Sequence, residues 1–250
     1  MIVIARLGYI SFSIAALIVS ANIMAAPVVY LDETAFLSDL ATAGYSVVHE
    51  GFENDDVWGE VRSSIVDGFH SATEVTSQGM VWTSNFLAGS ITTGEGPAVT
   101  GMYGFYSYPH GSYATPDPGS DCLVPGDCGD GWRGRAVDGL IYAIGGWIDT
   151  NTPYAKLGMF IGEYPDNPVD FGETCDPPDS ENCISNATIG TQSEFFGVID
   201  LVGFERFEYR ELEGKIEGPF EGDLKYIFAD DFYFVAGNPD VIFRNNFESE

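Results

Sequence analysis

The chain has 250 residues, of which 45% are hydrophobic and 14% aromatic, and its 38 acidic and 10 basic residues give a formal charge of -28. A chain this apolar can bury a substantial core, which excludes an intrinsically disordered acidic tail. The negative charge weighs against nucleic-acid and anionic-membrane partners and favours binding of cations. We therefore expect a folded domain with an acidic surface and no nucleic-acid partner.

The N-terminus has the layout of a secretory signal peptide. Arg6 precedes an apolar run from Leu7 to Val19, and small residues follow it. An uncleaved anchor is the alternative, but the run is short for a membrane span of about 20 residues. We expect residues 1–26 to be removed and the mature chain to be extracytoplasmic, without a transmembrane segment. Cleavage can follow any of three small residues, of which the last two fit best: Ala21, Ala25 and Ala26.

The first element expected in the mature chain is a short helix. Asp32 can cap its N-terminus, Phe36, Leu37 and Leu40 lie on one side of it, and Gly44 can end it.

Short extended segments follow the helix up to Val235. They are, in chain order, YSVVHEGFE, GMVWTSNFLA, PAVTGMYGFYSY, VDGLIYAIGGWIDT, AKLGMFIGE, SEFFGVIDL, FERFEYREL and LKYIFADDFYFV. Residues 137–150 are apolar on both faces, which indicates a central strand. The pattern predicts an all-β fold: an antiparallel, jelly-roll-like β-sandwich of about nine strands with one short N-terminal helix. We assign residues 27–236 to this domain and residues 237–250 to a C-terminal tail after a Gly-Asn-Pro break.

The four cysteines form two close pairs, Cys122 with Cys128 and Cys175 with Cys183, in loops rich in Gly, Pro and Asp. Export to an oxidising compartment favours disulfides, and local pairing is the simplest of the three connectivities. A metal site is the competing interpretation. It is weak because no C-x-x-C spacing occurs and no histidine lies near either pair.

Two adjacent aspartates, Asp230 and Asp231, interrupt the apolar run KYIFADDFYFV. Alternation in a strand places their side chains on opposite faces, so one carboxylate should point inward or to a strand edge. A buried carboxylate needs a cation or hydrogen-bond donors, and basic residues are scarce in this chain. The pair is therefore a candidate calcium site. The alternative is a β-bulge that turns both side chains to solvent, or capping of loop amides.

Several segments together resemble a known group of secreted proteins. The opening strand ending in HEGFE, the central AIGGWIDTNTP, the pair FFGVIDLVGFERFEYRE and the closing FADDFYFV are similar to β-sandwich ectodomains of bacterial proteins sorted by a PEP-CTERM tail. The PEP motif, the C-terminal apolar helix and the basic terminus of that group are missing here. Sorting of that kind therefore does not carry over. The tail DVIFRNNFE instead looks like a short C-terminal signature of some secreted bacterial proteins, and packing of the tail onto the sandwich is the alternative.

The opening and closing strands are also similar to those of jelly-roll carbohydrate-binding modules. That resemblance implies a structural Ca²⁺ between an acidic residue near the first strand and an aspartate on the last strand. The matching positions are Glu50 or Glu53 and Asp230 or Asp231. Glycan binding is implied by the same analogy, and one fold hosts many functions.

Acidic loops are a second candidate for ion binding, although a solvated, disulfide-stapled loop is the favoured interpretation. Their acids are Asp117, Asp121, Asp127 and Asp130 in one loop, and Asp176, Asp179 and Glu181 in the other.

Exposed aromatic side chains are candidates for stacking against sugars. Trp132, in GDGWRGR, is the tryptophan best placed on a loop, and Tyr106 and Tyr108 lie in the run MYGFYSYPHGSY. Core packing is the more common fate of any single aromatic side chain in a sandwich.

Catalytic motifs are absent from the sequence. There is no HExxH, no G-x-S-x-G, and no metal-ligand spacing among His49, His70 and His110. Our leading hypothesis is a secreted, non-enzymatic binding or surface-matrix module, with a glycan or extracellular matrix as partner and structural Ca²⁺. The alternative hypothesis is a polysaccharide-active enzyme that uses paired carboxylates. A third is a purely structural matrix protein.

Overall fold

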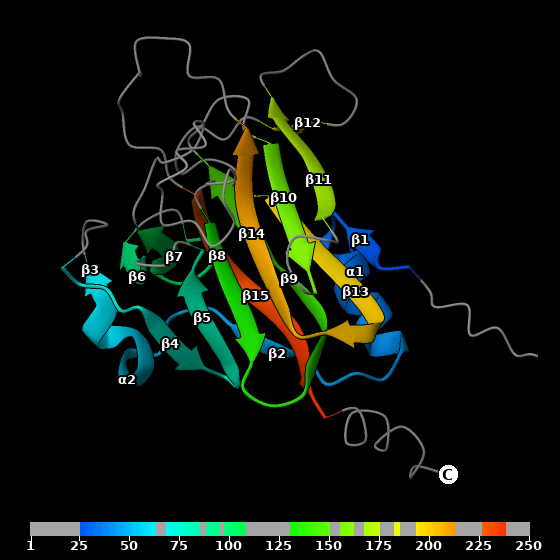
Figure 1. Cartoon of the computed structure of the whole chain (residues 1–250), viewed down its shortest axis with the longest axis horizontal. Helices are drawn as coiled ribbons and strands as arrows, with labels where there is room; N and C mark the ends of the chain where they lie inside the picture. The colour runs from blue at the N-terminus through cyan, green and yellow to red at the C-terminus, as the bar shows by residue number, and fades with distance from the viewer. Residues whose placement is uncertain are drawn as a thin grey trace, which may run out of the picture.

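Two β-sheets pack face to face and form the body of the protein, as the computed structural model in Figure 1 shows. The structure describes residues 26–63, 69–85, 89–95, 98–108, 131–150, 156–162, 168–175, 183–185, 194–213 and 227–238.

The first sheet has the strand order β1-β13-β9-β15-β7-β6-β3, with β2 also paired to β15. Its strands are β1 (Val28–Tyr30), β2 (Val48–Glu50), β3 (Arg62–Ser63), β6 (Ser90–Glu95), β7 (Tyr103–Tyr108), β9 (Leu140–Thr150), β13 (Glu194–Phe204) and β15 (Ile227–Gly237).

The second sheet has the order β12-β11-β10-β14-β8-β5-β4 and lies nearer the viewer in Figure 1. Its strands are β4 (Glu74–Ser77), β5 (Met80–Ser84), β8 (Gly131–Ala136), β10 (Lys156–Ile161), β11 (Pro168–Cys175), β12 (Cys183–Ser185) and β14 (Arg206–Glu213). Most neighbours are antiparallel, but β3 with β6 and β11 with β12 are parallel.

The predicted all-β sandwich is confirmed, with more strands than the nine expected and with mixed rather than purely antiparallel sheets. The jelly-roll connection stays a prediction. Within the described residues no helix is long and apolar enough to cross a membrane. The predicted signal peptide lies almost wholly outside the described residues, and so does the tail from residue 239 onward.

Strand β9 is the central strand that its two apolar faces predict, because it lies between β13 and β15. Ile144 and Ile148 point into the space between the sheets. Ala143 and Trp147 belong to a second apolar cluster on the outer face of the first sheet. The sheet is therefore covered on both sides.

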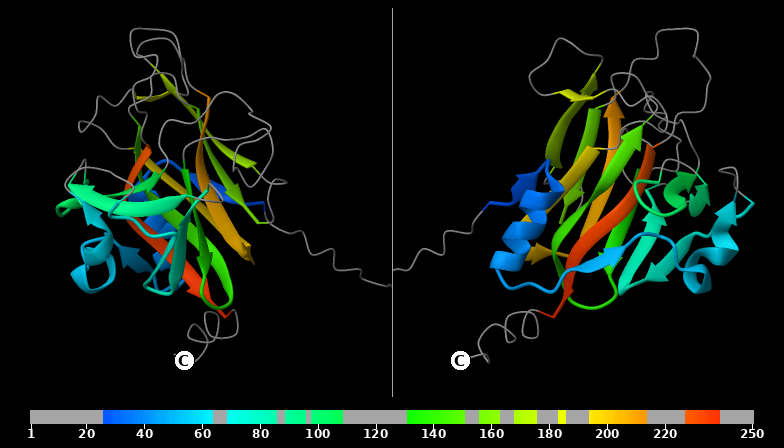
Figure 2. Two further views of the ribbon diagram at one scale, coloured as in Figure 1. Left: turned by 60° about the vertical axis from the view of Figure 1, so that its left-hand side comes forward. Right: turned by 180° about the vertical axis from the view of Figure 1, so that it is seen from behind.

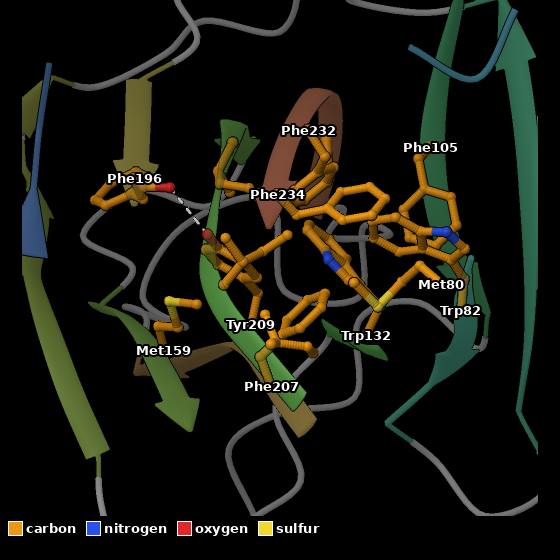
Figure 3. Close-up of a cluster of buried hydrophobic side chains, with 14 of the residues drawn as sticks. Met80, Trp82, Phe105, Trp132, Met159, Phe196, Phe207, Tyr209, Phe232 and Phe234 are labelled. Atoms are coloured by element: carbon orange, nitrogen blue, oxygen red, sulfur yellow. Dashed lines mark hydrogen bonds between the residues drawn. The ribbon is translucent and has the colours of Figure 1, made fainter. Parts of the chain in front are cut away.

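The core between the sheets is unusually aromatic, and Figure 3 shows its centre. The Trp82 ring lies 5.1 Å from that of Phe232, and the Trp132 ring stacks on Tyr209 at 5.8 Å. The Tyr209 hydroxyl donates to the carbonyl oxygen of Phe196 over 2.9 Å, which joins the two sheets and satisfies a buried polar group. Burial raises the pKa of Tyr209 well above its usual range.

The helix α1 (Glu33–Thr42) covers part of the outer face of the first sheet, as the view from behind in Figure 2 shows. Its formation follows from the predicted signals. Asp32 accepts a hydrogen bond from the Ala35 amide at 2.7 Å, and Phe36 and Leu40 are fully buried against the sheet. A second helical turn, α2 (Asp55–Trp58), continues into a 3-10 turn η1 (Gly59–Val61), and neither is indicated by the apolar pattern.

Candidate functional site

The Asp230–Asp231 pair lies where strand β15 changes partners along one edge. Phe228 and Ala229 pair with β7, and from Phe232 onward the strand pairs with β2 instead. The two aspartates fall in the gap between these ladders. On the other edge the pairing with β9 shifts register between Asp230 and Tyr233, and Asp231 has a φ of +47°. The pair therefore forms a β-bulge, one of the arrangements that the sequence predicts.

Asp230 is almost fully buried, with 1% of its surface exposed. Its Oδ2 accepts backbone hydrogen bonds from Val99 at 2.7 Å and Thr100 at 3.0 Å. Its Oδ1 is buried and has no hydrogen-bond donor within the described parts of the chain. Burial raises the pKa of Asp230 to about 7, with a smaller rise from the charge of Asp231, although the backbone N–H groups act in the opposite direction.

Asp231 faces the same loop residue as Asp230. Its Oδ1 accepts a hydrogen bond from the Thr100 hydroxyl at 2.9 Å and lies 2.7 Å from His49 Nε2. The His49 ring stacks on Tyr233 with a centroid separation of 4.7 Å. The bulge therefore brings both carboxylates toward one short segment instead of placing them on opposite faces of the strand.

The two glutamates near the first predicted strand serve different neighbours. Glu53 Oε1 accepts hydrogen bonds from the amides of Met102 at 2.7 Å and Tyr103 at 2.8 Å. Glu50 is buried, accepts from the Phe52 amide at 2.7 Å and also accepts from the hydroxyl of Ser77 on the opposite sheet. Phe52 has a φ of +58°, so Glu50 holds the amide of a residue in the left-handed region.

Three carboxylates thus hold one segment, and we call this arrangement the carboxylate clamp: Glu53, Asp230 and Asp231 holding residues 98–103. Five donors of that segment point at the three side chains. The clamped segment turns Val99 and Met102 toward solvent, with 38% and 56% of their surfaces exposed. The clamp therefore fixes a short loop that carries two exposed apolar side chains.

Whether the clamp suits a metal ion depends on its oxygen atoms. Ca²⁺ takes six to eight oxygen ligands. Oxygens of Glu50 and Glu53 already accept from backbone or hydroxyl donors, whereas Asp230 Oδ1 is an orphaned, buried acceptor next to Asp231. Among the described residues no group of three or more His, Cys, Asp or Glu side chains has metal-site geometry. Asp230 and Asp231 therefore fit a cation better than Glu50 and Glu53 do, and calcium stays a prediction.

The predicted sugar-stacking aromatics lie elsewhere. Trp132 is fully buried in strand β8 at the centre of the core (Figure 3), so the prediction that it presents a face on a loop is wrong. Its alternation with Arg133 along the strand turns the ring toward the core. Tyr106 is 2% exposed and packs edge-on against Phe228 at 4.8 Å, which also leaves no free face. Tyr108 ends β7, and its side chain lies outside the described residues.

The two cysteine pairs stay predictions. Cys122 and Cys128 lie outside the described residues, as do the acids of both cysteine loops. The backbones of Cys175 and Cys183 belong to the adjacent strands β11 and β12.

The residues that the sequence did not single out are Thr100 and the amides around it. Thr100 contacts Asp230 and Asp231 across 130 and 131 positions of the chain. No local pattern marks such a residue, because its role follows from the sheet order. His49 lies inside a predicted strand, and only the pairing of β2 with β15 brings it to Asp231.

Comparisons with known proteins give two distant structural similarities. No protein-family model matches the chain, and no curated protein matches it. The K1 cleaved adhesin domain of Lys-gingipain from Porphyromonas gingivalis W83 is 13% identical, with a TM-score of 0.39, over 77% of this chain and 99% of that chain. TmCBM61, solved in complex with β-1,4-galactotriose, is 14% identical, with a TM-score of 0.26, over 64% of this chain and 89% of that chain. Neither similarity establishes a fold family or a ligand for this chain.

Proposed function

We propose that the protein is a secreted, non-enzymatic β-sandwich that acts as a binding or surface-matrix module, with glycans as its ligand class. The observation that carries the proposal is the carboxylate clamp, in which five hydrogen bonds fix residues 98–103 on the sandwich. Binding residues are commonly carried on loops that a rigid scaffold positions. Here three acidic side chains of the scaffold hold such a loop in position.

The exposed side chains of the clamped loop suit a sugar ligand. Met102 and Val99 are apolar and accessible, and ligand sites combine apolar contacts with a few fixed polar groups. The exposed hydroxyl-bearing residue Thr100 lies between them in sequence. An apolar pair of this kind can pack against the C–H face of a sugar ring.

We further propose that a structural Ca²⁺ binds at Asp230 Oδ1, with Asp231 as its second carboxylate. The orphaned oxygen and the adjacent charge support this site. A bound cation would keep Asp230 ionised and would compensate its burial. Export is part of the same proposal and is supported by the N-terminal sequence.

A glycan array tests the proposal, with Met102→Ala as the loop variant and Leu201→Ala as the matched control. The two side chains are equally exposed, at 56% and 54%, but Leu201 lies on β13 away from the clamp. We expect wild type and Leu201→Ala to bind the same glycans and Met102→Ala to lose at least about fivefold in affinity, as deletion of a central apolar contact does. An array on which wild type binds nothing would overturn the glycan proposal.

One observation favours the alternative, a polysaccharide-active enzyme: a carboxyl whose pKa lies at about 7 is suited to general acid catalysis. Against it, Asp230 is 1% exposed and one of its oxygens is held by two amides. Release of reducing sugar from a panel of polysaccharides, abolished by Asp230→Asn, would favour the enzyme over the binding module.

A further inference from the structure

The outer face of the second sheet carries basic side chains on two neighbouring strands. Strand β8 pairs with β14 so that Arg135 lies directly opposite Arg206, and Arg133 lies directly opposite Glu208. The alternating residues Trp132 and Phe207 point into the core, so the arginines belong to the outer face. In Figure 1 these two strands cross the front of the molecule.

Arg133 and Glu208 satisfy one another. Arg133 Nε donates to Glu208 Oε2 over 2.7 Å, and Asn85 Nδ2 donates to Glu208 Oε1 over 3.3 Å. Both partners of the ion pair are buried, at 9% and 2% exposure. Both oxygens of Glu208 are therefore occupied, and Glu208 does not neutralise the charges of Arg135 and Arg206.

The next row of directly opposed residues, across β4, β5, β8 and β14, contains no carboxylate. Its pairings join Thr76 to Val81, Val81 to Arg135, and Arg135 to Arg206. Both arginines are exposed, and neither forms an ion pair or hydrogen bond through its side chain with any described residue. In a chain with 38 acidic and 10 basic residues, two arginines side by side without a partner among the described residues are an unexpected arrangement.

A purely structural role explains the presence of Arg135 and Arg206 only in part. Arginine stems can cover apolar surface, and Val81, opposite Arg135, is 4% exposed. However, like charges directly opposite one another in a sheet are destabilising. A neutral side chain with a similar stem would cover Val81 without that repulsion. The two charges together are best explained by an anion that binds between them.

We propose that Arg135 and Arg206 form a binding site for the anionic group of an acidic glycan, either a carboxylate or a sulfate. The inference rests on the proposed function, because it names the glycan class. Side chains directly opposite in an antiparallel pair have Cβ atoms about 5 Å apart, so both guanidinium forks can reach one group.

The negative charge of the whole protein weakens the binding of an anionic ligand but does not prevent it. The field of distant acids is screened beyond about 8 Å at physiological ionic strength, whereas direct guanidinium contacts are not. Two arginines can hold one or two anionic groups. They cannot neutralise the six to ten phosphates that a typical nucleic-acid site engages. The arrangement therefore fits single charged sugars better than a nucleic acid.

Calorimetry with paired oligosaccharides tests the site. Trigalacturonate is compared with its fully methyl-esterified form, and a sulfated galactan oligosaccharide with its desulfated form. The site predicts binding of at least one charged member and much weaker binding of its neutral partner. Arg135→Gln and Arg206→Gln should each weaken binding at least about tenfold, because each removes charge-assisted hydrogen bonds.

The controls separate charge, fork geometry and folding. Leu201→Ala changes an exposed side chain on the first sheet and should leave binding unchanged. Arg135→Lys keeps the charge but loses the fork and should bind more weakly than wild type. Thermal melts confirm that each variant is folded.

Four results would overturn the site: no binding of either charged oligosaccharide, equal binding of charged and neutral forms, variants within about twofold of wild type, or equally tight binding of oligo(dT). The proposal would also be overturned if wild type sedimented as a dimer, the arginine variants as monomers, and all of them bound glycans equally. Arg135 and Arg206 would then serve self-association. If glycans bind, but charged forms bind no more tightly than neutral forms and both arginine variants bind all of them normally, this site is excluded while the proposed function stands.

Discussion

The raised pKa of Asp230 predicts that the protein loses stability as the pH rises, the opposite of an acidic residue whose pKa is lowered by folding. Its folded-state pKa of about 7 lies above the value of about 3.9 expected for an unfolded chain, so the native state binds the extra proton between these values. Its contribution to stability is therefore complete below about pH 4 and is lost as the pH rises through 7. We expect the melting temperature of calcium-free protein to fall across this interval.

Asp230→Asn tests this expectation, because the amide keeps the shape and cannot ionise. The variant should lose most of the fall in melting temperature between pH 5 and 8, and any stabilisation by Ca²⁺ should disappear with it. Asp138→Asn, on the exposed β8–β9 turn, is the control and should behave as wild type. Equal pH slopes in wild type and Asp230→Asn would contradict the assignment.

At the level of single residues, alternation in KYIFADDFYFV indicated correctly that a carboxylate of the Asp230–Asp231 pair needs a partner. Of the two alternatives it left open, capping of loop amides is present, whereas the bulge does not turn the side chains to solvent, because each residue is only 1% exposed. The identity of the partner could not be predicted. Val99 and Thr100 are separated from Asp230 by 131 and 130 residues and reach it only through the order of strands in the sheet.

At the level of elements, strand β9 depends on a glycine for its fit to β15. A Cβ atom on Gly146 would lie 2.5 Å from the Phe232 ring, which is closer than van der Waals contact allows. We expect Gly146→Ala to lower the free energy of unfolding by about 1–3 kcal/mol, as overpacking of a core does. Urea denaturation followed by tryptophan fluorescence measures the change.

Gly59→Ala is the matched control, because the nearest atom to its added Cβ lies at 3.7 Å and its φ is -58°. This variant should be neutral or slightly stabilising. If Gly146→Ala were as stable as wild type, the close packing of β9 against β15 would be wrong.

Elements with a strong local signal were predictable, and those without one were not. Helix α1 has a capping aspartate and an apolar side, and strands β9 and β15 are long and apolar. Strands β6 and β8 have the sequences SITTGE and GWRGRA, whose polar residues and glycines read as loop. These residues predict a loop position for Trp132, although pairing with β5 and β14 holds it in the core.

At the level of the whole molecule, the two sheets leave the acidic residues with two kinds of role. Some connect segments far apart in sequence: Glu53 holds the Met102 amide, and Glu50 accepts from the Ser77 hydroxyl. All 38 acidic residues together, against 10 basic ones, give the chain its charge of -28. Apolar alternation predicted two packed layers, but it could not predict which segments the carboxylates join, since that depends on the pairing of distant strands.

Amide hydrogen exchange of residues 98–103, followed by NMR, tests the central claim that carboxylates clamp this loop. The amides of Val99, Thr100, Met102 and Tyr103 should exchange at least about tenfold more slowly than in an unstructured peptide, although the loop is exposed. Asp230→Ala should release the first two amides and Glu53→Ala the last two. Exchange of all four at unstructured rates in wild type would contradict the clamp.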